Sequence, residues 1–245
     1  MSNSSSNPNL GVMTMSDANF GDVELLTPFE SAVDTCVAPI VYQKSAMYVQ
    51  LQECTVDGLV ANATTIDIIF EQIIGDVHVW FQNLDTTVKK LILENADEWF
   101  SSRIEKQTID DTFVSTLRSG TKAGKNLRHV RLNVELDINR IPSVPIYGEN
   151  SKIVSLDKIL SDTRVIPIVE ICGLKFTRKN FNIEISLRQL RIVPFDNLFN
   201  RCIIVGEPQI LKSEQSFSIS IENLLEKCAD MSTNNQLIFI QKLKD

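Results

Sequence analysis

Residues 165–193 read VIPIVEICGLKFTRKNFNIEISLRQLRIV, and this stretch decides the fold class. Apolar and polar residues alternate along most of its length, as they do in β-strands with one buried face. Glycine and short polar segments interrupt the alternation, so the sequence predicts a series of short strands. The apolar row changes parity between Leu187 and Leu190. That change predicts a β-bulge near Arg188 and Gln189.

A second alternating stretch, residues 128–138 (RHVRLNVELDI), predicts a strand with one face exposed to water. Pro142, Pro145 and Gly148 interrupt the chain after it, and further short strands follow. Five or more closely spaced strands, with few helical periods among them, predict a small closed or nearly closed barrel. The predicted fold class is therefore mainly β with a few helices (α+β).

The pattern in the N-terminal half is more mixed. Its apolar spacing predicts short strands near residues 41–51, 66–70 and 77–81, a helix over about 85–100, and a shorter helix over 108–117. Asp85 is expected to cap the longer helix, whose apolar stripe begins at Val88.

The composition changes near Gly120, where a basic loop begins and the strand patterns become dense. We therefore predict three parts. Residues 1–22, rich in Ser and Asn, form a flexible arm, and residues 23–118 form a mixed α/β part packed on the barrel. Residues 119–245 form the barrel with a C-terminal extension.

Cysteine usage and hydropathy indicate a compartment. The five cysteines are scattered without a CxxC pair, which is typical of a reducing environment and of neither a disulfide framework nor a zinc site. The first residues lack the basic and apolar segments of a secretory signal, and no apolar run approaches the length of about 20 residues that crosses a bilayer. We expect an intracellular protein that neither crosses nor binds a membrane.

The charge is unevenly distributed. The whole chain carries a formal charge of −7, so general attraction to nucleic acid or to anionic membranes is not expected. Between Arg118 and Arg191, however, fourteen Lys and Arg stand against seven Asp and Glu, which leaves the rest of the chain at −14. A polyanion site would therefore lie in this central region, although an ordinary solvated strand surface fits the same counts.

Cations combined with aromatic rings suit single-stranded nucleic acid, because bases stack on the rings while the cations hold the backbone. The predicted binding residues share this chemistry and the central region: Lys122, Lys125, Arg128, Arg131, Lys175, Phe176, Arg178, Lys179, Phe181, Arg188 and Arg191. Phe176 and Phe181 also share the parity of the apolar rows, so core packing is the competing interpretation of both rings.

Catalysis finds little support in the sequence. His78 and His129, the two histidines, stand in no metal-binding pattern. The segment GTKAGKN at 120–126 lacks the glycine spacing and the Ser or Thr of a phosphate-binding loop. The acidic pair Asp110 and Asp111 is explained by a helix start. We predict no catalytic residue, no metal and no cofactor.

Several segments together resemble a known family. They are NADEWF (95–100), KNLRHVRLNV (125–134), SKIVSL (151–156), VIPIVEICGLKF (165–176) and ISLRQLRI (185–192). Their order resembles the single-stranded-DNA-binding proteins of nucleocytoplasmic large DNA viruses. The succession strand, Gly, apolar-x-Phe, strand is similar to the C-terminal half of the African swine fever virus member. The resemblance covers roughly residues 85–193.

The resemblance implies an OB-like Greek-key barrel with helical and strand embellishments. It implies non-sequence-specific binding of single-stranded DNA, without catalysis, in the replication or repair of a large DNA virus. The partners would be single-stranded DNA, replication proteins and a second copy of the chain, in the host cytoplasm or a viral replication factory. The alternative function is that of a viral structural or scaffold protein that uses the barrel for protein contacts.

Overall fold

The computed structural model describes residues 11–70, 75–102, 104–122, 124–148, 151–160 and 163–194. For Lys122 and Lys125, which lie within these ranges, only the backbone is described. Residues 1–10 of the predicted arm and the predicted C-terminal extension also lie outside it. Within the described ranges, no helix combines the length and the hydropathy needed to cross a membrane.

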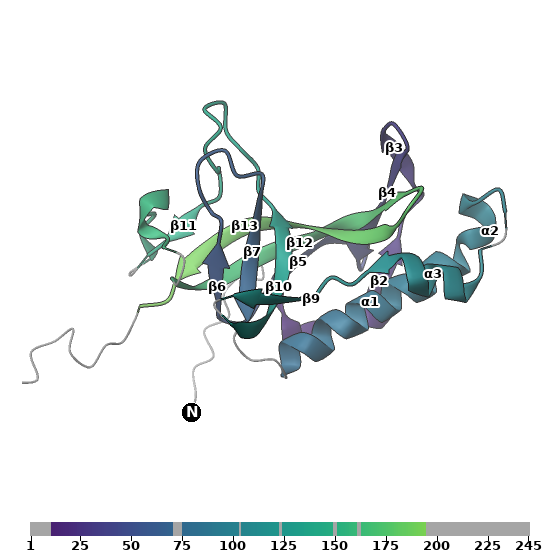
Figure 1. Ribbon diagram of the computed structural model, residues 1–245, viewed down its shortest axis with the longest axis horizontal. Helices are drawn as coiled ribbons and strands as arrows, with labels where there is room; N and C mark the ends of the chain where they lie inside the picture. The colour runs from purple at the N-terminus through teal and green to yellow at the C-terminus, as the bar shows by residue number, and fades with distance from the viewer. Residues whose placement is uncertain are drawn as a thin grey trace, which may run out of the picture. The chain divides into compact units, whose positions relative to one another are not determined.

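A long antiparallel hairpin organises the fold (Figure 1). It consists of β12 (Arg164–Thr177) and β13 (Phe181–Ile192), paired from Val165↔Ile192 to Phe176↔Phe181. The register shifts between Ile168 and Val169 and leaves Arg188 unpaired, which confirms the predicted bulge. A second shift, at Cys172, was not predicted. Because bulges preserve pairing while changing side-chain parity, two continuous strands replace the predicted series of short ones.

The two edges of the hairpin recruit the other strands. Along its outer edge β12 pairs in turn with β6 (Cys54–Asp57), β5 (Ser45–Gln50) and β4 (Thr35–Tyr42). The edge of β13 pairs with β11 (Ile146–Tyr147), β10 (Lys125–Asn133) and β8 (Phe113–Val114). β7 (Thr65–Phe70) joins β6 to β10. The strands β12, β6, β7, β10 and β13 thus close a five-stranded barrel, as predicted for an OB-like α+β fold.

Smaller elements extend the sheet or connect it. The strands are β1 (Val12–Thr14), β2 (Val23–Leu25), β3 (Phe29–Ala32) and β9 (Arg118–Lys122), and the 3-10 turns are η1 (Met15–Asp17), η2 (Phe20–Asp22) and η4 (Leu156–Lys158). β9 and β10 form a hairpin where the sequence predicted a basic loop.

The domain boundaries differ from the prediction. β1 pairs with β5, and Met15 is buried, so residues 11–22 belong to the fold instead of to a flexible arm. The barrel also takes β6 and β7 from the part predicted to pack against it. Strands from both sides of the predicted boundary at residue 118 therefore share one barrel.

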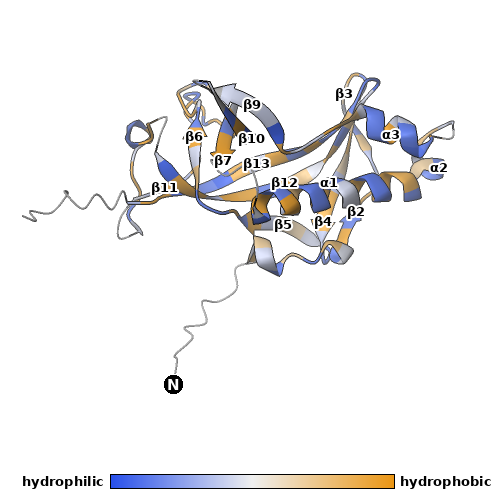
Figure 2. Cartoon of the chain, turned by 60° about the horizontal axis from the view of Figure 1, so that its bottom comes forward, coloured by the Kyte–Doolittle hydropathy of each residue, from blue (hydrophilic) through white to orange (hydrophobic). Residues whose placement is uncertain are grey.

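The helices cover the strands with an apolar stripe. They are α1 (Asp76–Glu94), α2 (Ala96–Trp99) and α3 (Lys106–Thr112). Trp80, Leu84, Val88 and Ile92 of α1 are buried, and hydrophobic and hydrophilic residues alternate around this helix (Figure 2). The strand predicted at 77–81 was wrong, because VHVWF alternates over five residues only and its burial follows the 3.6-residue period of the longer helix.

Asp85 does not cap a helix; it lies buried in the interior of α1. Its carboxylate accepts hydrogen bonds from Ser115 Oγ at 2.9 Å, from the backbone N–H of Thr116 at 3.1 Å and from Thr116 Oγ1 at 2.5 Å. Burial raises the pKa of Asp85 despite these donors. This carboxylate therefore links α1 to the segment that leads into β9.

Gly173 marks the closest approach between β12 and β4. A Cβ built there would lie 2.9 Å from the carbonyl oxygen of Ala38. Ala38 lies in β4, whose backbone is paired with β12, so this oxygen cannot move away easily. We expect Gly173→Ala to lower the free energy of unfolding by about 1–3 kcal/mol, measured by urea denaturation. Gly21→Ala is the control, since its added Cβ meets only the side chain of Asn19. Equal stability of the two variants would contradict this assignment.

The buried Asp85 also gives a pH prediction. Asp85→Ala leaves both donors of Thr116 without this acceptor and should cost about 2–3 kcal/mol. Asp85→Asn keeps one acceptor oxygen, and its Nδ2 can donate to a hydroxyl oxygen, without a buried charge. Because the folded-state pKa of Asp85 is raised above its ordinary 3.8, its stabilising contribution is lost as pH rises. Urea denaturation from about pH 4 to about pH 7 should therefore favour Asp85→Asn increasingly over wild type; a constant difference would refute this.

Candidate nucleic-acid interface

The β12–β13 hairpin has one apolar and one polar face. Leu174, Ile183, Ile185 and Leu187 are buried on the apolar face. The opposite face, here called the hairpin face, carries half-buried, mostly polar side chains: Glu170, Cys172, Lys175, Asn182, Glu184, Ser186 and Arg188. The strand alternation thus places polar groups from both strands on one side of the hairpin.

A cavity of about 180 Å³ lies where the hairpin face meets β9 and β10. Arg118 from β9, Arg131 from β10 and Lys175 from β12 all line it. The amide side chains of Asn133 and Asn182 lie in the same wall, together with Glu184, Ile183 and Ile185. Cations from three separate strands therefore converge with hydrogen-bonding amides on one small space.

Arg118 is the unusual member of this group. Its Nε is buried and has no hydrogen-bond partner, and no ion pair of Arg118 is found in the part of the chain that the structure describes. His129, its register partner on β10, likewise has a buried Nδ1 without a partner. An unsatisfied buried donor is costly, and an anionic ligand in the cavity would satisfy the guanidinium. Arg118 was not among the binding residues predicted from the sequence, because β9 has no alternating pattern that shows which way the side chain of Arg118 points.

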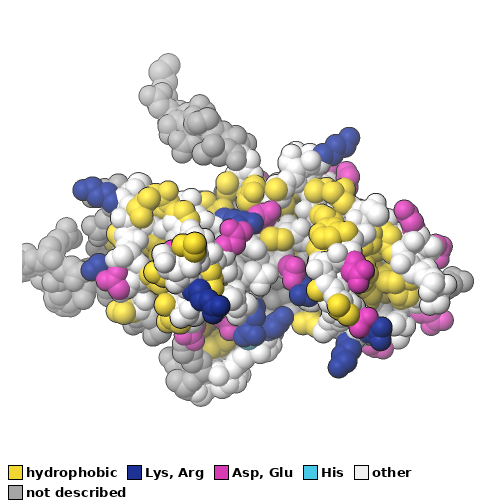
Figure 3. All heavy atoms as spheres, turned by 90° about the horizontal axis from the view of Figure 1, so that it is seen from above, with side chains coloured by type: hydrophobic (Ala, Val, Ile, Leu, Met, Phe, Trp, Pro, Cys, Tyr) yellow, Lys and Arg dark blue, Asp and Glu magenta, His cyan; other side chains and the backbone are white. Residues whose placement is uncertain are grey.

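The predicted cations at the cavity already have acidic partners. Arg131 donates to both carboxylate oxygens of Asp67 at 2.9 and 3.0 Å, and this hydrogen bonding lowers the pKa of Asp67 and raises that of Arg131. Lys175 Nζ lies 3.1 Å from Glu184. Basic and acidic side chains also lie close together on the face seen in Figure 3. The site is therefore a balanced polar surface with a small excess of positive charge.

Arg188 is held between two glutamates, Glu170 and Glu135. Its Nε donates to Glu170 of β12 at 2.6 Å, and its Nη1 pairs with Glu135, which follows β10. Burial lowers the pKa of Arg188, but the hydrogen bonds and charges of the two glutamates outweigh it and raise the pKa above its ordinary value. The bulged residue thus links β12, β13 and the end of β10, and its charge is largely neutralised.

The remaining predicted cations do not converge on the cavity. Arg178 and Lys179 lie in the turn between β12 and β13, where Arg178 pairs with Asp34 at 2.7 Å. Arg191 lies near the other end of β13, and Arg128 donates to Ser119 within the β9–β10 hairpin. Lys179 and Arg191 are exposed, without an ion pair among the described residues. For Lys122 and Lys125 the structure gives only the backbone, in β9 and β10.

The two predicted aromatic residues belong to a cluster near the hairpin turn. The ring of Phe176 lies parallel to that of Trp99, with centroids 6.2 Å apart, and edge-on to Phe100. Phe181 is buried against Phe100, as the competing core interpretation proposed. The rings of Phe176 and Trp99 are half-buried, so they are better placed than the buried ring of Phe181 to contact a base. Trp99 was not selected from the sequence, because its spacing there indicated only a helix stripe.

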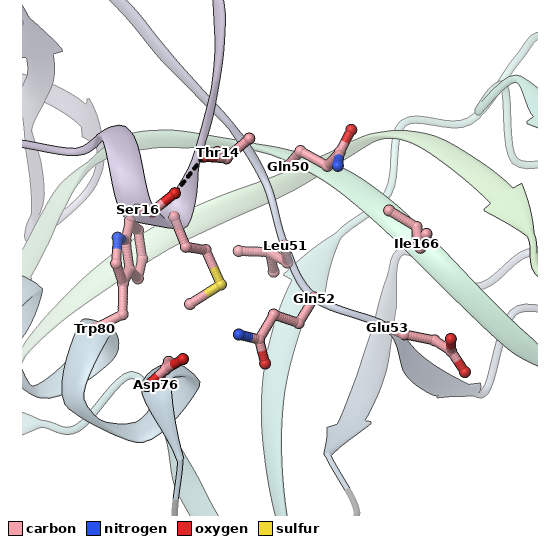
Figure 4. A pocket seen from close by; sticks show the side chains of 10 residues that line it. Thr14, Ser16, Gln50, Leu51, Gln52, Glu53, Asp76, Trp80 and Ile166 are labelled. Atoms are coloured by element: carbon pink, nitrogen blue, oxygen red, sulfur yellow. Dashed lines mark hydrogen bonds between the residues drawn. The ribbon is translucent and has the colours of Figure 1, made fainter. Parts of the chain in front are cut away.

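A second cavity, of about 520 Å³, lies between η1, the end of β5 and the start of α1 (Figure 4). Its lining includes Glu53 and Asp76, and no Lys or Arg is among the described residues that line it. It shares no lining residue with the cavity at the hairpin face, so it is separate from the candidate interface. In the described ranges, no group of three or more His, Cys, Asp or Glu side chains is placed to hold a metal ion.

No family model and no curated protein sequence matches the chain. The solved structures that are similar include forms of the single-stranded DNA-binding protein from bacteriophage Enc34. The complex with ssDNA is 7% identical, with a TM-score of 0.41, and covers 70% of this chain and 97% of that chain. A C-terminal truncation is 8% identical, with a TM-score of 0.40, and covers 70% and 96%. TM-scores of this size do not establish a shared topology.

Proposed function

We propose that this protein binds single-stranded DNA without sequence specificity, through the hairpin face and the cavity beside it. The observation that carries this proposal is the convergence of Arg118, Arg131 and Lys175 on one cavity, where the buried Nε of Arg118 has no partner. A phosphate would pair with the accessible part of this half-buried guanidinium, which has no ion pair among the described residues. Asn133 and Asn182 can donate to and accept from base edges in the same space.

The balance of charge favours a single strand over a duplex. Double-stranded DNA carries one negative charge per ~1.7 Å of its axis, so a protein that grips it needs a broad surface of positive charge. Here Asp67 and Glu184 stand beside the cations and weaken the local field. A single strand has a lower charge density and exposes its bases to the amides and to the rings of Phe176 and Trp99.

The narrower parts of the proposal follow from the sequence resemblance. The protein would act on exposed strands during replication or repair of a large DNA virus, in the host cytoplasm or a viral replication factory. It would have no catalytic activity of its own. Replication proteins and further copies of the chain would be its partners.

A second candidate function is that of a structural or scaffold protein. The observation that favours it is the internal pairing of four predicted cations, namely Arg131, Lys175, Arg178 and Arg188. A surface whose charges are mutually satisfied suits a protein contact as well as a nucleic acid. The two functions predict opposite results when one of the carboxylates is removed.

Binding to a labelled oligo-dT should depend on salt and on the cavity. We expect log K to fall linearly with log salt, with a slope of roughly −0.7 per phosphate contacted. The double variant Arg118→Gln and Lys175→Gln should weaken binding at least 10-fold. It should also make the slope less steep by about 0.7, the value for one phosphate contact. Fluorescence anisotropy at several salt concentrations measures both quantities.

Lys158→Gln is the matched control, because Lys158 is an exposed cation in η4, outside the residues that line the cavity. It should change affinity by less than twofold. Circular dichroism shows whether each variant is folded. Absence of oligo-dT binding by the folded wild type at low salt would reject the proposed function, and equal effects of the control and the double variant would reject the site.

Removing the carboxylate partner of Arg131 should strengthen binding. Asp67→Asn frees the guanidinium for phosphate, and we expect a 3- to 10-fold gain in oligo-dT affinity with a small loss of stability, about 0.5–1 kcal/mol. Anisotropy and urea denaturation of the same samples measure the two effects. A loss of stability without any gain in affinity would instead support a purely structural ion pair and the scaffold function.

A further inference from the structure

A separate groove lies between α1 and α3, outside the hairpin face. Its volume is about 350 Å³, and its walls are formed by Thr86, Lys89, Lys90, Leu93, Lys106, Ile109 and Asp110. None of these residues belongs to the proposed DNA site. The groove therefore requires its own explanation.

The accessible apolar floor of the groove is formed by Leu93. This side chain is 41% exposed, whereas Ile109, which also lines the groove, is fully buried. Val79, two heptads before Leu93 on the same side of α1, is 54% exposed. Large aliphatic side chains on the outward side of a helix form a surface that gains free energy when another apolar group covers it.

Lysines surround this apolar floor. Lys89 is held in place by Asp110 at 2.9 Å, and its Nζ lies 5.2 Å from the ring centroid of Phe113. Lys90 pairs with Glu94 at 3.3 Å across one helical turn, and both side chains remain more than half exposed. Lys106 is exposed and has no ion pair among the described residues. Because Lys89 and Lys90 are paired with acids, the excess positive charge at the rim is that of Lys106, in a chain whose formal charge is −7.

We propose that this groove docks an acidic peptide segment of another protein, with one or two apolar side chains packed against Leu93 and the aliphatic stems of the lysines. The volume suits side chains of that number, and the lysines complement flanking Asp or Glu residues. A nucleic acid would leave the apolar floor unused, because its phosphates need donors and not aliphatic carbon. The pattern of apolar anchors within a charged rim is common at peptide-binding surfaces.

The test uses the full-length chain and a fluorescein-labelled nine-residue peptide in which Glu and Asp flank a central Leu-Phe pair. We expect saturable binding by anisotropy. A peptide with Lys in place of the acids, and one with Ser in place of Leu-Phe, should each bind at least 5-fold more weakly. Saturable binding that is indifferent to either change, or no binding at millimolar peptide, would overturn the proposal.

Variants locate the binding. Lys106→Glu and Leu93→Ser change an exposed rim charge and a partly exposed floor residue, so both should fold, and each should weaken the peptide at least 5-fold. Lys158→Glu is the matched charge reversal outside this groove and should change affinity by less than twofold. Equal effects of Lys106→Glu and Lys158→Glu would show general electrostatic attraction and overturn the site.

Competition separates this surface from the DNA site. Unlabelled oligo-dT should not displace the peptide, and Lys106→Glu should leave oligo-dT affinity within twofold of wild type. Displacement by oligo-dT would show one general polyanion site and refute a peptide groove. If the protein bound anionic phosphatidylserine vesicles in a way that required Lys106, but did not bind the peptide, the groove would be a membrane site. That result would also refute the peptide proposal.

Discussion

The pairing of β12 with β13 is the constraint on which the rest of the fold depends. Both edges of this hairpin are used: β6, β5 and β4 add to one edge, and β11, β10 and β8 add to the other. The barrel closes through short contacts, among them Asn133↔Ser186 and Val165↔Cys54. A ring closed by so few pairs requires the hairpin to bend strongly, and its two bulges provide the local twist.

The same bulges determine the chemistry of the hairpin face. The bulge at Arg188 lets its guanidinium reach Glu170 and Glu135, and that at Cys172 brings its Sγ to 3.2 Å from Ser186 Oγ. These half-buried contacts fix side-chain directions more than they stabilise the fold, because partly solvated ion pairs contribute little free energy. A ligand therefore meets positioned groups, but it must compete with carboxylates for Arg131 and Lys175.

The sequence predicted what depends on local periodicity. The parity change between Leu187 and Leu190 predicted a bulge near Arg188 and Gln189, and it lies at Arg188; dense strand patterns indicated the barrel. Local patterns failed where burial comes from distant elements. VHVWF looked like a strand because it is short and because Phe20, a ring partner of Trp80, is far away in the chain. Asp85 looked like a cap because its donors at residues 115 and 116 lie 30 and 31 positions away. The convergence of Arg118 with Lys175 likewise depends on tertiary structure.

Two positively charged places on an acidic chain need not serve the same ligand, and the surface beneath the charge distinguishes them. At the hairpin face the cations stand among amides, hydroxyls and carboxylates, so a ligand must bring hydrogen-bonding groups to replace those contacts. Between α1 and α3 the lysines surround Leu93, where a ligand would gain by burying carbon. A polynucleotide would meet the first requirement and an amphipathic peptide the second. The excess of acidic residues in the chain as a whole would weaken the binding of either ligand outside its own surface.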